Sequence, residues 1–242
     1  MTERLDRVWP HAEVDVSDDA LVAELRTGAP VLRVNFVSSV DGAATHNGLS
    51  GGLSGDADKR YFELLRRASD VVLVGAGTVR AEGYGPLRVS DDSVRWRVAN
   101  GLPEHPVFAI ASRSLEVDPA IVRKAPVRPI LVTVADASVP SALAEADVVV
   151  AGEGSVEGQR VVGALAERGL TTVLCEGGPH LFASLLADGV VDELCLTVSP
   201  VLEGGDGPRI TAGLGEPHGL ELAGILRSNS TLLLRYRRAG LV

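Results

Sequence analysis

Six short apolar runs, each four to seven residues long, recur along the first three quarters of the chain. Runs of this length that are rich in Val, Ile and Leu are typical of strands, because helices in globular proteins are usually longer. A continuous run, rather than an alternating one, indicates a strand covered on both faces, as in a parallel sheet. The pattern therefore predicts buried strands at residues 31–37, 71–74, 106–111, 129–134, 147–151 and 171–175.

Apolar residues at helical spacing lie between these strands. The clearest helix is predicted to open at residues 54–58 and to end near Ser69, because Tyr61, Leu64 and Leu65 form one apolar stripe. A charged segment at 91–97 and the polar residues 1–28 show too little periodicity to predict an element. Further helical segments are predicted at 140–146, 154–168 and 179–186, with a short one after Gly75.

The last quarter of the chain alternates apolar and polar residues, beginning at residues 193–198. Residues 220–226 and 231–236 are predicted to pair as an antiparallel hairpin. In the second of these strands Leu232, Leu234 and Tyr236 share the face expected to join the core. Leu233 shares the other face with Arg235 and Arg237, so it is expected at an edge or a subunit interface.

Alternating strands and helices followed by a hairpin predict an α/β fold with three layers. The sheet is expected to be mixed and mainly parallel, with helices on both faces and the antiparallel hairpin at its end. No repeat and no linker divides the chain. We therefore expect an N-terminal extension, residues 1–28, followed by a single domain, residues 29–242.

Composition narrows the functional classes. The 242 residues are 45% apolar and 23% charged, and the net charge of −9 argues against a nucleic-acid partner, which needs a basic face. No apolar run approaches the ~18 residues of a membrane span, and the N-terminus lacks a signal-peptide pattern. The two cysteines, Cys175 and Cys195, lie in apolar runs and indicate buried thiols in a reducing compartment. We expect a cytoplasmic protein without a membrane partner.

Two junctions of strand, glycine and helix carry the candidate chemistry. Glu176-Gly177-Gly178-Pro179 follows a predicted strand and opens a helix, an arrangement that favours an anion near bare backbone N–H groups. Glu176 is either an acid near the helix dipole or a group that faces something other than the anion. The second junction, residues 75–80, places Arg80 where G-x-G-x-x-G needs its third glycine, so its signal is weak.

Four further features are ambiguous by themselves. Asp41 ends the first predicted strand, where α/β sheets place ligands, but Asp41-Gly42 is equally typical of a turn. Ser112-Arg113-Ser114 could bind a phosphate or form an exposed turn. Arg66, off the apolar stripe of its helix, is expected on a solvated face. The His11-Ala12-Glu13 triplet matches part of a zinc deaminase motif, but no two cysteines are three apart, so that class is rejected.

Taken together, four motifs resemble one family. These are Val34 to Gly42, Val74 to Val79, Glu176 to Pro179 and Val191 to Leu194. Their order and spacing resemble the reductase family of riboflavin biosynthesis over about residues 29–238. The resemblance implies a dihydrofolate-reductase-like fold, a homodimer, and NADPH as cofactor. It implies reduction of the ribose of 5-amino-6-(5-phosphoribosylamino)uracil to a ribityl chain, with no metal.

The resemblance also implies a set of site residues. The acids near the reacting centre would be Asp41 and Glu176, and Arg66 would pair with the substrate phosphate. Substrate contacts are expected at Asn35, Ser50, Arg66, Leu87, Arg88 and Glu176. Cofactor contacts are expected at Val37, Gly77, Thr78, Arg80, Glu82, Ser112, Arg113, Gly177, Gly178, Pro179, His180 and Leu181, with Arg80 and Arg113 near the 2′-phosphate because arginine suits that group.

Departures from the family pattern lie on the substrate side. No deaminase half is present, and Asn35 stands where the bifunctional branch usually has Lys, as in the archaeal and fungal branch. Residues 52–54 and 82–87 replace two stretches common in the bifunctional branch. Two alternatives therefore remain open: a dihydrofolate or pterin reductase on the same fold, and a nucleotide-binding homologue without turnover.

Overall fold

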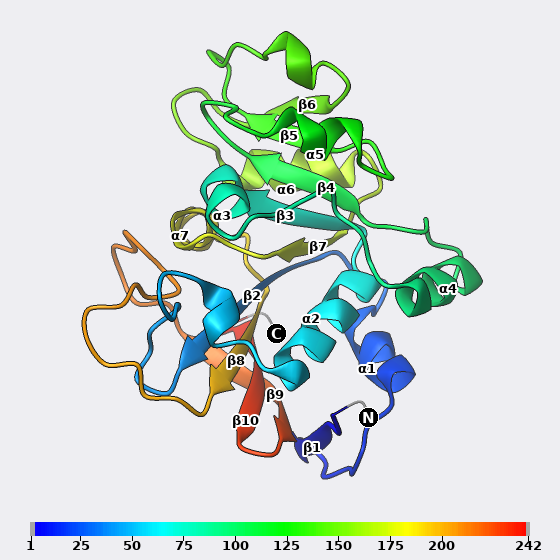
Figure 1. Cartoon of the computed structure of the whole chain (residues 1–242), viewed down its shortest axis with the longest axis vertical. Helices are drawn as coiled ribbons and strands as arrows, with labels where there is room; N and C mark the ends of the chain where they lie inside the picture. The colour runs from blue at the N-terminus through cyan, green and yellow to red at the C-terminus, as the bar shows by residue number, and fades with distance from the viewer. Residues whose placement is uncertain (1–2, 241–242) are drawn as a thin grey trace.

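The computed structural model describes residues 3–240, and its centre is one mixed sheet of ten strands within that range. The strand order is β1-β9-β10-β8-β2-β7-β3-β4-β5-β6, and from β8 to β6 all neighbours are parallel (Figure 1). The mainly parallel sheet and its antiparallel end are confirmed. The strands are β1 Asp6–Trp9, β2 Val31–Ser39, β3 Val71–Gly75, β4 Val107–Ala111, β5 Ile130–Thr133, β6 Asp147–Val150, β7 Thr172–Cys175, β8 Glu193–Ser199, β9 Leu220–Ser228 and β10 Thr231–Arg238.

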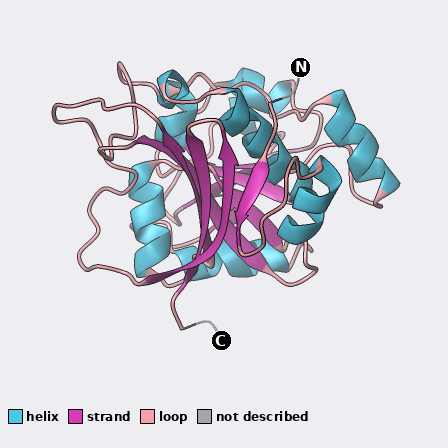
Figure 2. Cartoon of the chain, turned by 90° about the horizontal axis from the view of Figure 1, so that it is seen from below, coloured by secondary structure: helices cyan, strands magenta, loops and turns pink. Residues whose placement is uncertain are grey.

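Helices cover both faces of this sheet, as the three-layer expectation requires (Figure 2). On one face α1, α2 and α5 bury a core that includes Leu25, Leu64 and Ile121. On the other face α6 and α7 pack Val161 and Leu185 against the central strands. Among the described residues, none of the helices is both long and apolar enough to cross a membrane. The helices are α1 Asp18–Leu25, α2 Asp56–Ala68, α3 Ala76–Ala81, α4 Asp91–Ala99, α5 Pro119–Arg123, α6 Gly158–Ala166 and α7 Pro179–Ala187, with 3-10 turns at Ser50–Gly52 and Ser141–Leu143.

The N-terminal segment is more ordered than its polarity indicates. Strand β1, residues 6–9, pairs antiparallel with β9 and so belongs to the same sheet. In α1 the side chains of Leu21, Val22 and Leu25 are buried, and Ser17 Oγ accepts a hydrogen bond from Ala20 N at the start of the helix. These three buried residues in eight were too few to show helical periodicity, yet they stabilise the helix once α2 supplies the opposite surface.

The faces of β10 are the reverse of those expected. This strand lies between β9 and β8, and Leu233 is only 2% exposed in the core under α1 and α2, whereas Leu232 is 37% exposed. Two arginines, Arg235 and Arg237, share the helix-covered face with Leu233 because each pairs with an acidic side chain there. Arg235 lies 3.7 Å from Glu24 of α1, and Arg237 Nε donates to Glu193 Oε1.

A fully buried arginine fastens α4 to the end of α2. The charged segment that showed no periodicity forms α4, capped by Ser90 Oγ accepting from Ser93 N. Arg97 Nη1 donates to the carbonyl oxygens of Arg67 at 3.0 Å and Ser69 at 2.6 Å, and Nε donates to Pro103 O. Without Arg97, the carbonyl oxygens of Arg67 and Ser69 at the end of α2 would lack this hydrogen-bond donor. Burial lowers the pKa of Arg97 to about 10, so it stays charged at neutral pH.

We predict that Arg97→Ala lowers the free energy of unfolding by about 2–4 kcal/mol, because it strands several buried carbonyl oxygens. The matched control is Arg95→Ala on the same helix, where an exposed arginine pairs only with Asp92. The control should change stability by less than about 0.5 kcal/mol. Urea unfolding followed by circular dichroism measures both, and equal effects would contradict the assignment.

Candidate active site

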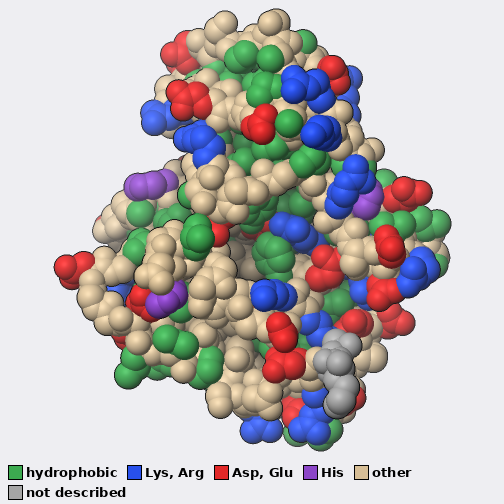
Figure 3. Space-filling model, viewed as in Figure 1, with side chains coloured by type: hydrophobic (Ala, Val, Ile, Leu, Met, Phe, Trp, Pro, Cys, Tyr) green, Lys and Arg blue, Asp and Glu red, His purple; other side chains and the backbone are tan. Residues whose placement is uncertain are grey.

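A large cavity opens at the carboxyl ends of the central strands. It is a cavity of about 510 Å³ that touches the ends of β2 and β7, one side of α2 and the segment after α3. In the space-filling view the surface is hollowed across the middle of this face, between the part that carries β3–β6 and the part that carries α2 (Figure 3). Parallel α/β sheets bind ligands at this edge.

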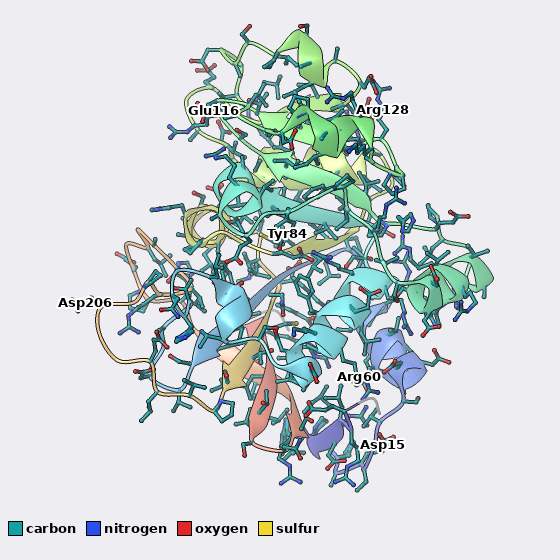
Figure 4. The ribbon with its side chains drawn as sticks, in the orientation of Figure 1. Asp15, Arg60, Tyr84, Glu116, Arg128 and Asp206 are labelled. Carbon is teal, nitrogen blue, oxygen red and sulfur yellow. The ribbon has the colours of Figure 1, made fainter. Side chains whose placement is uncertain are left out.

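A buried ion pair forms one wall of the cavity. Glu176 follows the last residue of β7, and its side chain is 1% exposed. Arg66 of α2 binds it with two parallel hydrogen bonds, Nε to Oε1 at 2.6 Å and Nη2 to Oε2 at 2.8 Å. Tyr84 lies centrally in Figure 4, and its hydroxyl donates to the same Oε2 at 3.0 Å. The carboxylate is thus held by three donors from two segments.

Aromatic rings enclose the guanidinium of this pair. The Cζ atom of Arg66 lies 4.3 Å from the ring centroid of Phe62 and 5.8 Å from that of Tyr84. Burial alone would lower the pKa of Arg66, but the Glu176 carboxylate outweighs it and raises that pKa. Burial and the same carboxylate raise the pKa of Tyr84. The tyrosine is therefore a hydrogen-bond donor here and a poor proton donor. Arg66 lines the cavity rather than the solvated face that its position beside the apolar stripe predicts by itself. The substrate contact that the family resemblance implies for it stays a prediction.

Two loops close the cavity from the side of α2. Glu82 Oε1 accepts a hydrogen bond from Ser50 N at 2.9 Å, so this acid connects the end of α3 to the 3-10 turn that follows β2. Ser54 Oγ donates to Asp58, a buried acid in the first turn of α2 that also lines the cavity. Glu82, expected to contact a cofactor, thus also holds the loop that carries Ser50.

The glycines of the two junctions meet between β3 and β7. Gly75 N donates to Gly177 O at 2.8 Å, and the Gly177–Gly178 peptide is cis. A Cβ on Gly178 would collide with Thr78 Oγ1, so only glycine fits there. Gly178 is also the N-cap of α7 and Pro179 its first residue, as the sequence predicts. Bare backbone therefore faces the space where the two junctions meet.

A second, more open groove lies on the other side of the same junction. It has a volume of about 700 Å³ and runs along the carboxyl ends of β3, β4 and β5. Ser112 Oγ accepts from Leu115 N, and Arg80 Nη1 donates to Glu116 O. Arg113 is exposed and makes no side-chain hydrogen bond or ion pair with the described residues. Cavity and groove flank residues 75–78, so the chain has room for an extended ligand that passes over the glycines.

The expected site residues divide into three groups. Eleven line the cavity: Asn35, Val37, Ser50, Arg66, Thr78, Glu82, Leu87, Arg88, Glu176, Gly178 and Pro179. Four line the groove: Gly77, Arg80, Ser112 and Arg113. Asp41, Gly177, His180 and Leu181 line neither, and Asp41 instead accepts hydrogen bonds from Ser39 Oγ and from the backbone N–H groups of Glu203 and Gly204.

Some cavity residues are absent from the sequence-based set. Phe62 carried a usable signal, because it precedes Arg66 by four positions on α2 and must lie on the same side. Tyr84 and Pro208 carried none, since both come from loops whose path depends on the whole fold. The chief additions are Asp58, Lys59, Phe62, Tyr84 and Pro208.

Comparison with known proteins identifies the family of this chain. The family model of the RibD C-terminal domain matches residues 30–234. A 2,5-diamino-6-ribosylamino-4(3H)-pyrimidinone 5′-phosphate reductase of Methanothermobacter thermautotrophicus is 29% identical over 182 residues, covering 73% of this chain and 80% of that protein. The riboflavin biosynthesis protein RibD of Mycobacterium tuberculosis is 30% identical over 183 residues, 74% of this chain. The chain spans 45% of that longer protein.

A solved structure has the same fold. The crystal structure of a pyrimidine reductase-like protein from Corynebacterium diphtheriae superposes with a TM-score of 0.78 at 24% identity. The match covers 92% of this chain and 99% of that one. It confirms the fold expected from the four motifs.

We predict that Tyr84→Phe lowers the free energy of unfolding by about 1.5–3 kcal/mol, the usual cost of losing a hydrogen bond to a charged group. The matched control is Tyr61→Phe, because the buried hydroxyl of Tyr61 has only a weak contact, 3.9 Å, with Cys195 Sγ. That change should cost less than about 0.5 kcal/mol. Thermal and urea unfolding measure both variants, and a larger loss for Tyr61→Phe would count against the role given to Tyr84.

Proposed function

The chain belongs to the RibD C-terminal reductase family of riboflavin biosynthesis, and on this premise we propose that it reduces a phosphoribosylaminopyrimidine with NADPH. The observation that carries the proposal is the buried Arg66–Glu176 pair in a cavity that adjoins the glycine junction. A buried carboxylate facing a cavity suits the N–H groups and developing positive charge of an aminopyrimidine. The open groove beyond the glycines suits the adenosine end of a dinucleotide.

The residues present fit the proposed cofactor. A Cβ on Gly77 would project into open space, so a pyrophosphate can approach the backbone there, whereas the Thr78 hydroxyl occupies the place of a Cβ on Gly178. The reduced nicotinamide supplies the hydride for C1′ of the opened ribose. This chain supplies placement: Val37 and Thr78 line the part of the cavity next to the glycines.

We propose that residues other than Arg66 bind most of the substrate phosphate. Two N–H donors of Arg66 already bind Glu176, which leaves the two on Nη1 and one on Nη2 for a ligand. Lys59 and Arg88 also line the cavity and are exposed at their ends. We therefore assign the phosphate chiefly to Lys59 and Arg88, with Arg66 holding the Glu176 side chain in its orientation.

Steady-state assays decide the activity. We expect NADPH oxidation with a 5′-phosphorylated ribosylaminopyrimidine, tested as both the 2,5-diaminopyrimidinone and the deaminated uracil. The rate should fall greatly with the dephosphorylated form.

Glu176→Gln should lower kcat/KM at least about a hundredfold, because it unpairs Arg66 and removes the charge. Turnover of dihydrofolate that an antifolate blocks would favour a pterin reductase. Binding of NADPH by calorimetry without turnover of either class would favour an inactive homologue.

Cofactor preference is assigned to Arg113 rather than shared equally with Arg80. Arg80 is tied to the carbonyl of Glu116, whereas Arg113 is exposed at the groove. Arg113→Ala should raise KM for NADPH about tenfold or more and leave KM for NADH nearly unchanged, because the 2′-phosphate loses its guanidinium. Arg80→Ala serves as the comparison and should have a smaller effect. If neither substitution reduces the preference for NADPH over NADH, neither arginine binds the 2′-phosphate.

A homodimer is proposed through the sheet face opposite α1. On that face Leu234 pairs across the strands with Leu196, and Tyr236 with Leu222. Leu222 is 42% exposed and Leu232 is 37% exposed, unlike apolar residues on the helix-covered face. A two-fold contact between two such faces would bury both copies.

Sedimentation at micromolar concentration should give about twice the 25.2 kDa chain mass. Leu222→Asp should shift the chain to monomer, because it buries a charge in the contact. Val148→Asp, at an equally exposed position on the distant strand β6, is the control. A fully active wild-type monomer would rule the dimer out.

A further inference from the structure

The acid of the Asp41-Gly42 turn binds a distant loop rather than the cavity. We call residues 201–212 the strap, because this segment runs from the end of β8 past the end of β2 to α7. Asp41 Oδ1 accepts from Glu203 N at 3.1 Å and Oδ2 from Gly204 N at 2.7 Å. The hydroxyl of Ser39 also donates to Oδ1. Both carboxylate oxygens are therefore occupied.

The glycines at this contact leave room for close packing. Gly42 has a φ of +91°, which favours glycine, and a Cβ there would lie 3.2 Å from Arg209 Nη1 of the strap. A Cβ on Gly207 would lie 3.0 Å from the Cβ of Ala43. In this turn Asp41 therefore binds the strap, and Gly42, which has no side chain, allows the strap to pack closely.

The strap reaches the cavity beyond this contact. Val40 N donates to Val201 O at 2.9 Å and Ala44 N to Pro208 O at 2.7 Å. Pro208 lines the cavity, and Ala212 N donates to Pro179 O at the start of α7. A shift of the strap would therefore move a wall of the cavity and touch the helix start beside the glycines.

We propose that the Asp41-Gly42 turn is the docking site of the strap, and that Asp41 is a positioning residue which holds the cavity wall. It acts on a bound ligand only through the strap. The three hydrogen bonds hold the pKa of Asp41 down, at about 2, so the group is charged and unsuited to donate a proton near neutral pH. The kinetic consequences rest on the proposed reductase function, but the structural ones do not.

The first test measures the protein without ligands. Hydrogen–deuterium exchange of peptides spanning 201–212 is compared in the wild type, Asp41→Asn and Asp206→Asn. The asparagine amide would turn a donor toward a backbone N–H, so exchange should rise about tenfold in the strap. Asp206 is an exposed acid on the same strap (Figure 4), and its side chain makes no hydrogen bond or ion pair within residues 3–240, so its variant should exchange as the wild type does.

The second test separates positioning from chemistry. Asp41→Asn should raise KM for the pyrimidine about tenfold, while the single-turnover rate at saturating ligand stays within about threefold. A lost single-turnover rate with unchanged strap exchange would overturn the proposal and make Asp41 a catalytic acid. Unchanged exchange and unchanged KM would overturn it as well.

The docking role of Asp41 can still be tested if its variant does not fold or if the wild type has no reductase activity. If Asp41→Asn does not fold, Ser39→Ala removes one of the three donors and should still raise strap exchange, and failure to do so overturns the docking role. If the wild type reduces no pyrimidine, the proposed function fails, whereas strap exchange still decides whether Asp41 docks it.

Discussion

The bidentate contact between Arg66 and Glu176 is the constraint on which the rest of the site depends. A buried ion pair is favourable only when its geometry is good and its remaining lone pairs are satisfied. The fold meets both conditions: Tyr84 supplies a third donor, and the end of α2 is fixed by Arg97 through its carbonyls and by Arg26 through Ala68 O. Elements that never touch the cavity therefore determine its charge distribution.

The sequence predicted most of the sheet because buried parallel strands leave a strong local signal. Five of the six continuous runs match their strands within a residue at either end, and the first runs on to Ser39 as β2. The hydrophobic pattern gave wrong or missing predictions where contacts between distant elements determine which residues are buried. Leu233 looked peripheral beside two arginines, yet those arginines pair with Glu24 and Glu193 under the helices. The same reason hid α1 and α4, whose stability comes from α2.

The candidate site was accessible from sequence only in part. Residues that follow strand ends, such as Glu176 after β7 and Thr78 in α3 after β3, could be placed together because parallel strands share an edge. The partner of Glu176 could not, since a lone arginine beside a helical stripe is ordinarily solvated. Tyr84 and Pro208 enter from loops that carry no periodic signal, so only the assembled fold brings them to the cavity.

The pairing of β1 with β9 has a consequence for how the chain behaves outside its native context. Residues before position 30 lie outside the family match, yet they cover the backbone of β9 at one end of the sheet. A chain without them would expose a row of backbone N–H and C=O groups of β9 near residues 225–227, where β1 now pairs. Such rows template intermolecular pairing, so the N-terminal segment guards this protein against aggregation as well as completing its sheet.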